Sequence, residues 1–196
     1  PARAAAALSS MACWHDNRRL YGGMPPASAA VPSGAVLKPL QATREAGRTN
    51  VSGNDAEALL AAFGVIMPFD VVDGASRTKG DGAELRIDIR RDAVLGPVLS
   101  LGPAGAWPEA LNDRAVAPLP MPRNLAGRAI TSLKGWPLLA RTCDEQAIAD
   151  AGMAIETLGS GILMLGSSFE RATVMLRLSS RGQSKVTAAD IVLTDE

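Results

Sequence analysis

Residues 83–120, AELRIDIRRDAVLGPVLSLGPAGAWPEALNDRAVAPLP, decide the fold class of this chain. Leu85, Ile87 and Ile89 alternate with charged residues, which is the period-two pattern of a half-buried strand. Gly96-Pro97 interrupts this strand, and the apolar run 98–101 begins a second one. The stretch therefore predicts two neighbouring strands with one face in a core and the other carrying charge.

Upstream of this stretch the sequence predicts mainly helices. Residues 2–20 are rich in good helix formers, and residues 21–34 have the Gly, Pro and Ser content of a linker. A short helix is expected over 36–45, and a second one follows Ser52 or Asn54 as a cap and ends at Gly64. Residues 65–72 are β-branched enough for a strand, although Pro68 limits it to an edge.

Downstream the pattern alternates between helix and strand. Helices are expected over 125–133 and 145–158, the second with a clear apolar stripe. Residues 172–178 alternate as a strand, and 186–193 reads as its hairpin partner. The predicted fold class is α/β, with N-terminal helices followed by a mixed sheet.

Composition excludes several classes of function. The net charge is +0 and aromatic residues make up 4% of the chain, so neither a basic face nor a stacking platform for nucleic acid is expected. The sequence has no uninterrupted apolar run that approaches the roughly 20 residues needed to span a membrane. Two distant cysteines and one histidine, His15, do not make a zinc site. We expect a cytoplasmic protein with free thiols.

Carboxylates and glycines gather around residues 84–113. Glu84, Asp88 and Asp92 lie along one predicted strand, and Glu109 and Asp113 follow the glycine-containing loop 102–105. Magnesium takes carboxylates together with phosphate oxygens, and loop amides bind anions. The pattern thus fits a metal–phosphate site. It fits equally a set of solvated charges beside a tight turn, and Arg90-Arg91 is interpreted as a solvated strand end.

A family resemblance favours the first of these alternatives. The stretch resembles the ATP-grasp part of NDP-forming acyl-CoA synthetases, which carries a run of the form E-L-x-x-G-x-x-R-D-x-x-F-G-P-V-x-x-x-G-x-G-G-x-x-x-E-x-x-x-D. The residues that carry the resemblance are Gly82, Glu84, Leu85, Arg91, Asp92, Leu95, Gly96, Pro97, Val98, Gly102, Gly105, Glu109, Asp113, Pro118 and Leu119. DAEALLAAFGVIMP, residues 55–68, resembles the segment that leads into ATP-grasp in this family.

The resemblance implies ADP-forming ligation, in which ATP, an acid and CoA give acyl-CoA, ADP and phosphate. By position it assigns Glu84, Asp92, Gly102 and Gly105 to the nucleotide and phosphate side, and Glu109 to the metal. It also implies a structural or site role for Arg91. It implies Mg-ATP or Mg-ADP and CoA as ligands, and other synthetase domains or subunits as partners. It also divides the chain into 1–34, resembling the end of a CoA-ligase domain, and 35–196, a partial ATP-grasp domain.

Three departures from the family pattern limit what the resemblance implies. The lobe that carries the phosphate-gripping lysine is missing, since Val72 reaches Gly82 in under a dozen residues. Pro103 and Ala104 alter the glycine loop, and Arg177 stands where the nearest match to a metal-binding motif has an acid. We therefore expect a chain that is degenerate or depends on segments it lacks. The alternative function is a non-catalytic α/β binding or assembly module.

Overall fold

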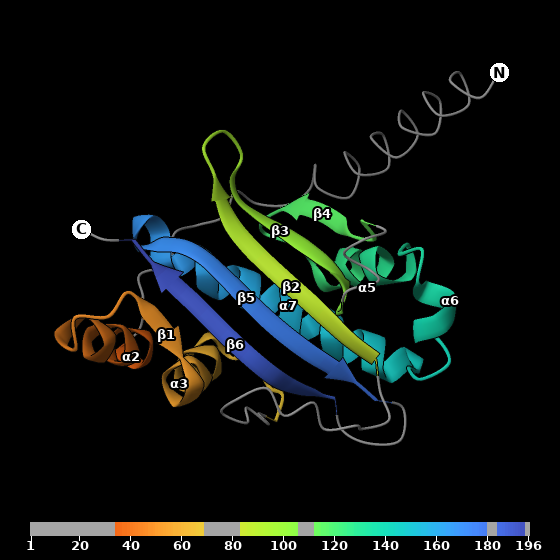
Figure 1. Ribbon diagram of the computed structural model, residues 1–196, viewed down its shortest axis with the longest axis horizontal. Helices are drawn as coiled ribbons and strands as arrows, with labels where there is room; N and C mark the ends of the chain where they lie inside the picture. Colours follow the sequence, from red (N-terminus) through yellow and green to blue (C-terminus); the bar gives the residue numbers. More distant parts are fainter. Residues whose placement is uncertain (1–33, 69–82, 106–111, 180–183, 195–196) are drawn as a thin grey trace.

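A six-stranded sheet forms the body of the fold. The computed structural model describes residues 34–68, 83–105, 112–179 and 184–194. The strands lie in the order β1-β6-β5-β2-β3-β4, and every neighbouring pair is antiparallel (Figure 1). Their bounds are Asn50–Ser52 for β1, Ala83–Asp92 for β2, Gly96–Pro103 for β3, Ala115–Pro118 for β4, Phe169–Leu178 for β5 and Lys185–Leu193 for β6.

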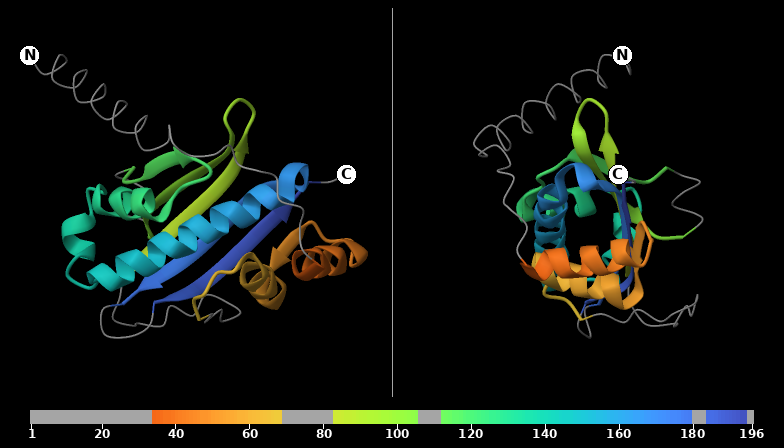
Figure 2. Two further views of the ribbon diagram at one scale, coloured as in Figure 1. Left: turned by 180° about the vertical axis from the view of Figure 1, so that it is seen from behind. Right: turned by 90° about the vertical axis from the view of Figure 1, so that its left-hand side faces the viewer.

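Helices lie on one face of this sheet and at one of its edges. Their bounds are Gly34–Glu45 for α2, Gly53–Phe63 for α3, Arg123–Thr131 for α5, Trp136–Leu139 for α6 and Glu145–Leu165 for α7, with a 3-10 turn over Gly166–Ser168. Helix α7 crosses behind the sheet with α5 beside it, and the opposite face carries no helix among the described residues (Figure 2). The described part of the chain is thus a two-layer α/β fold with one open sheet face.

Strand β2 shows why the sheet has two different faces. Leu85, Ile87 and Ile89 are at most 1% exposed and belong to the core with α7, because they alternate onto the covered face. The residues between them, from Glu84 to Arg90, point to the open face. Strand β2 pairs with β3 over residues 85–92 and with β5 over residues 83–90, so these charges lie in the middle of the sheet.

Helix α7 is longer than the sequence predicts. Asp144 caps its first turn by accepting a hydrogen bond from the N–H of Ala147 at 2.8 Å. The predicted end at Leu158 is wrong, because the glycines that follow serve close packing. A Cβ on Gly161 would lie 2.2 Å from the Phe63 ring of α3, so only glycine lets the two helices approach. By length and mean hydropathy Glu145–Ser168 would suffice to span a membrane, but half of its apolar window is buried in the fold, as in a core helix.

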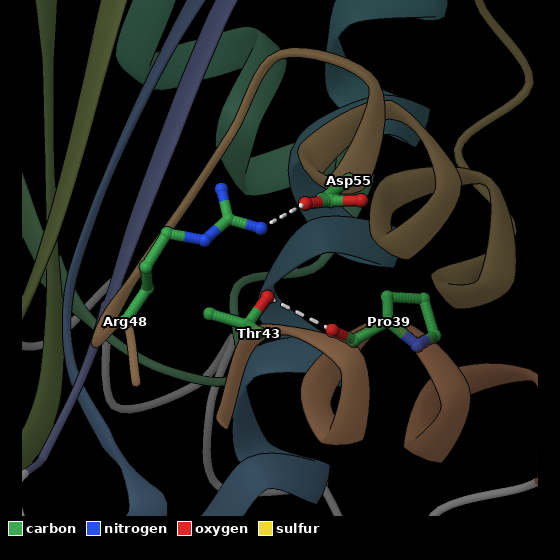
Figure 3. Close-up of polar contacts among 4 residues, drawn as sticks. All are labelled: Pro39, Thr43, Arg48 and Asp55. Carbon is green, nitrogen blue, oxygen red and sulfur yellow. Dashed lines mark hydrogen bonds and ion pairs between the residues drawn. The ribbon is translucent and has the colours of Figure 1, made fainter. Parts of the chain in front are cut away.

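Helices α2 and α3 close the β1 edge of the sheet. Thr43 is fully buried in α2 and donates a hydrogen bond to the carbonyl of Pro39 at 2.9 Å (Figure 3). Arg48, between α2 and β1, reaches Asp55 in the first turn of α3 at 3.0 Å. This ion pair is exposed and contributes little to stability. Gly64 ends α3 in the left-handed region at φ +92°, as its position after the helix predicts.

The predicted α/β class is confirmed, with two further corrections. The sheet is not mixed in direction, because all its described pairs are antiparallel. Residues 65–68 form no strand; Pro68 has no N–H for a ladder and instead accepts a hydrogen bond from Val186 through its carbonyl. The hairpin of β5 and β6 is confirmed. The predicted N-terminal helix, the linker, the turn at 73–82 and His15 lie outside the described residues.

Candidate functional site

The open face of the sheet carries a polar cavity of about 430 Å³. It lies over the middle of β2, β3 and β5 and reaches the segment before β4. The charged residues that line it are five arginines and three carboxylates, namely Arg86, Arg90, Arg91, Arg114, Arg171, Asp88, Asp113 and Glu170. The cavity is therefore basic although the chain as a whole is neutral.

Two of these arginines face each other across neighbouring strands. Arg90 of β2 and Arg171 of β5 are register partners, and both are exposed. Neither guanidinium has an ion pair or hydrogen bond within the described part of the chain. Like charges directly opposite in a sheet destabilise it. This pair is unfavourable for the fold alone and becomes favourable when an anion lies between the two guanidinium groups.

A polar network borders the arginine pair on the same face. The carboxylate of Asp88 accepts a hydrogen bond from the Thr173 hydroxyl at 2.8 Å and pairs with the Nε of Arg86 at 2.9 Å. Thr173 lies directly opposite Asp88 in the sheet. Arg114, exposed just before β4, adds a further positive charge without a partner among the described residues. The network holds the Asp88 carboxylate in place. Arg90, Arg114 and Arg171 are left to bind a ligand.

Arg91 lines the cavity but has a structural role. Its Nε donates to the carbonyl of Phe169 at 3.1 Å, and its Nη2 donates to the carbonyl of Gly166, just after α7. A cation at a helix C-terminus stabilises the unpaired carbonyls there. Arg90 and Arg91 are both exposed, as a solvated strand end predicts, and Arg91 also holds the helix end, which is the structural role that the family motif suggests for it.

Glu84 lies at the beginning of β2 and does not line the cavity. Its Oε1 accepts from the Nη2 of Arg177 at 2.5 Å, and the two residues are directly opposite in β2 and β5. The side chain of Arg177 is only 11% exposed, so this is a largely buried pair on the arginine's side. Arg177, which stands where the family motif has an acid, is therefore neutralised by Glu84, a residue that the resemblance assigns to the nucleotide side.

Asp92 lies at the other end of β2, about 26 Å from Glu84 along the strand at the usual rise per residue. Its Oδ1 accepts hydrogen bonds from the N–H groups of Leu95 at 2.9 Å and Val94 at 2.8 Å. These two bonds, with that of Leu95 the stronger influence, lower the pKa of Asp92. Asp92 therefore stabilises the β2–β3 turn by accepting these two hydrogen bonds. Its place beside a phosphate stays a prediction.

The predicted glycine loop is partly a strand. Gly102 is buried in β3 and lines the cavity, and a Cβ there would lie 2.5 Å from the carbonyl oxygen of Asp113. A side chain at position 102 would overlap the backbone of Asp113, which explains why this position holds glycine. Gly105 has φ +113° and open space around it, as a flexible loop residue would. Glu109, the predicted metal ligand, lies outside the described residues.

The described residues do not fit a magnesium site. Asp113 is buried, and its two oxygens accept the N–H groups of Lys134 at 2.8 Å and Gly135 at 2.7 Å. Asp88 is bound to Thr173 and Arg86, which leaves Glu170 as the carboxylate of the cavity without a partner there. Within the described ranges, no three Asp, Glu, His or Cys side chains gather in a way that could hold a metal ion.

The arginine pair is what reasoning from the sequence missed. Period-two alternation places Arg90 on the open face, and the same rule places Arg171 on its own strand's open face. Nothing in the sequence shows that these strands are neighbours in this register. The sequence does show that both predicted strands carry arginines on their polar side, which could have pointed to an anion site.

Comparisons with known proteins agree with this architecture. Residues 69–160 match the family model of the ATP-grasp domain. The crystal structure of PH1788 from Pyrococcus horikoshii has a TM-score of 0.68 at 14% identity, over 83% of this chain and 99% of that one. The dinucleotide-forming acetyl-coenzyme A synthetase 1 of Ca. Korarchaeum cryptofilum, in its apo form, has a TM-score of 0.63 at 17% identity, over 80% of this chain and 99% of that one.

The same Korarchaeum enzyme in complex with coenzyme A and Mg-AMPPCP has a TM-score of 0.62 at 17% identity, over 80% of this chain and 99% of that one. No curated protein is significantly similar in sequence. At these identities the solved structures establish a common fold and no more. The match of residues 69–160 to the ATP-grasp model and this common fold both support the resemblance to the ATP-grasp part of NDP-forming acyl-CoA synthetases.

Proposed function

We propose that this chain is the nucleotide-binding part of an acyl-CoA synthetase-like ligase and binds the phosphates of ATP or ADP on the open sheet face. The observation that carries the proposal is the pair of arginines 90 and 171, directly opposite and without partners in the described part of the chain. A bridging phosphate would convert this repulsion into two charge-assisted bonds. The planar guanidinium group matches phosphate oxygens in geometry as well as charge.

The size and place of the cavity support a nucleotide. A volume of about 430 Å³ lies within the usual range of small-molecule sites. The Korarchaeum enzyme with the same fold was solved with Mg-AMPPCP and coenzyme A. By analogy we propose that the phosphates lie against Arg90, Arg171 and Arg114, with Gly102 beneath them. The roles of Glu84, Asp92, Gly105 and Glu109 at the nucleotide or metal stay predictions.

In the proposed reaction, ATP, an acid and CoA give acyl-CoA, ADP and phosphate. The contribution of this chain is to position the phosphoryl group and to stabilise its charge, which supply most of the catalysis in phosphoryl transfer. Other domains or subunits of the synthetase would contribute CoA binding and the acyl group. This division of work accounts for a chain that lacks the lysine-bearing lobe. A cytoplasmic location is part of the same proposal.

Isothermal titration with ADP and with ATP, in magnesium, tests the proposal. Arg90→Ala and Arg171→Ala should each weaken binding about tenfold or more, since a hydrogen bond to a charged group contributes about 1.5–3 kcal/mol. Arg141→Ala is the matched control, because Arg141 is also exposed and does not line the cavity. It removes the same charge and should leave the affinity unchanged.

Two results would contradict the proposal. Equal losses in all three variants would mean that the nucleotide follows net charge rather than this cavity. No heat with ADP, ATP or CoA would favour the non-catalytic assembly module. The exposed residues Val94 and Leu95 at the tip of the β2–β3 hairpin, 89% and 65% accessible, are the feature that such a module would use.

A further inference from the structure

We infer that the arginines of the open face take the place of magnesium, so that this cavity binds a polyphosphate without a divalent cation. The inference rests on the proposed function and specifies the ligand as a metal-free di- or triphosphate. It follows from the balance of charge in the cavity, from what its carboxylates already bind and from the distribution of its arginines.

Apart from Glu170, the described carboxylates in and beside the cavity are already bound to other groups. Asp113 holds two backbone N–H groups, and Asp88 holds Thr173 and Arg86. Glu84 holds Arg177 at 2.5 Å. A magnesium ion would have to displace these partners and would then lie among arginines, which repel it.

The arginines are placed to do what a metal does for phosphate. A metal bridges phosphate oxygens and neutralises their charge. Arg90 and Arg171 line the cavity from register-paired positions on adjacent strands, and Arg114 lines it from the segment before β4. Three cations from three parts of the chain would therefore surround successive phosphate groups. Free ADP also carries more negative charge than its magnesium complex, so a site of fixed positive charge favours the free form.

Titration of the full chain with ADP and with inorganic pyrophosphate, once in magnesium and once in excess EDTA, tests this inference. Wild-type protein should bind both probes at least as tightly in EDTA as in magnesium. Arg171→Ala should weaken binding about tenfold in EDTA. Arg171→Asp should weaken binding further than Arg171→Ala, because the new carboxylate would pair with Arg90 opposite and repel the phosphates. Arg141→Ala should behave as the wild type.

Tighter binding of ADP by the wild type in magnesium than in EDTA would overturn the inference and leave the proposed function standing. Absence of binding in both conditions would overturn the two together. The unfolding midpoint of each variant is measured without ligand. A variant with a wild-type midpoint and weak binding has lost the site, whereas one with a much lower midpoint has lost the fold. If the Arg171→Asp variant does not fold, Arg90→Asp replaces it, and the same loss of binding is expected.

Discussion

The two faces of the β sheet differ in what their residues do for the protein. On the covered face, Ile87 and its neighbours are almost completely buried, and each contact there favours the fold. On the open face, Arg90 and Arg171 lie directly opposite each other, an arrangement that opposes the fold. A single strand, β2, contributes to both. The residues of the covered face therefore stabilise the fold. The arginine pair on the open face destabilises it, and a bound anion would offset that cost.

The largest expected effect comes from the covered face. Ile87→Ala should lower the free energy of unfolding by about 2–5 kcal/mol, the usual range when a large buried side chain is truncated. Val116→Ala, an exposed position on edge strand β4, is the matched control and should change stability by about 0.5 kcal/mol or less. Urea denaturation of both variants measures the difference. Equal effects would contradict the assignment of the core to the α7 side.

The next largest effect is expected where α7 meets α3. Gly161→Ala should destabilise the protein by about 1–3 kcal/mol, because the new methyl group would overlap the Phe63 ring. Gly127→Ala in α5 is the control, since its Cβ would meet Ile148 at an ordinary 3.6 Å. That change should be neutral or stabilise the helix by up to about 1 kcal/mol. Thermal unfolding distinguishes them, and a stabilised Gly161→Ala would contradict the packing.

A smaller effect of opposite sign is expected on the open face. Arg171→Ala, in the absence of ligand and at low salt, should stabilise the fold by about 0.2–1 kcal/mol, because it removes a like-charge pair. The gain should disappear at high salt, where exposed charges are screened. Urea titrations at two ionic strengths measure it. Loss of stability at low salt would mean that Arg171 has a favourable partner, and the argument for an anion would fail.

The smallest effect concerns the turn between the two strands. The N–H groups of Leu95 and Val94 hold the pKa of Asp92 below its ordinary 3.8. The charged carboxylate therefore stabilises the fold above that pH, and this contribution is lost as the pH falls through the folded-state pKa. Asp92→Asn, which mimics the neutral form, should be less stable than wild type at neutral pH and equal to it in acid. A difference independent of pH would contradict this role.

Sequence patterns predicted the covered face well and the open face poorly. The predicted alternation in 85–90 and 172–178 and the predicted helical periodicity over 145–158 rest on burial, which acts locally along the chain. The end of α7 was missed because its glycines pack against Phe63 rather than stop a helix. The pairing of Arg90 with Arg171 depends on strand order and register, which local patterns do not encode.

The family motif was informative about the fold and less so about the roles of single residues. Its positions Arg91, Asp92 and Gly102 hold a helix end, a turn and a close backbone contact in this structure. Such tasks keep a fold intact whether or not a ligand binds. The residues that the open face offers to a ligand, Arg90, Arg114 and Arg171, come from alternation and register instead.

The most direct test of the central claim is a crystal structure of this chain with ADP. The account predicts phosphate density on the open sheet face, with the guanidinium groups of Arg90 and Arg171 both within hydrogen-bond distance of phosphate oxygens. Phosphates bound elsewhere, with the two arginines turned apart into solvent, would contradict it.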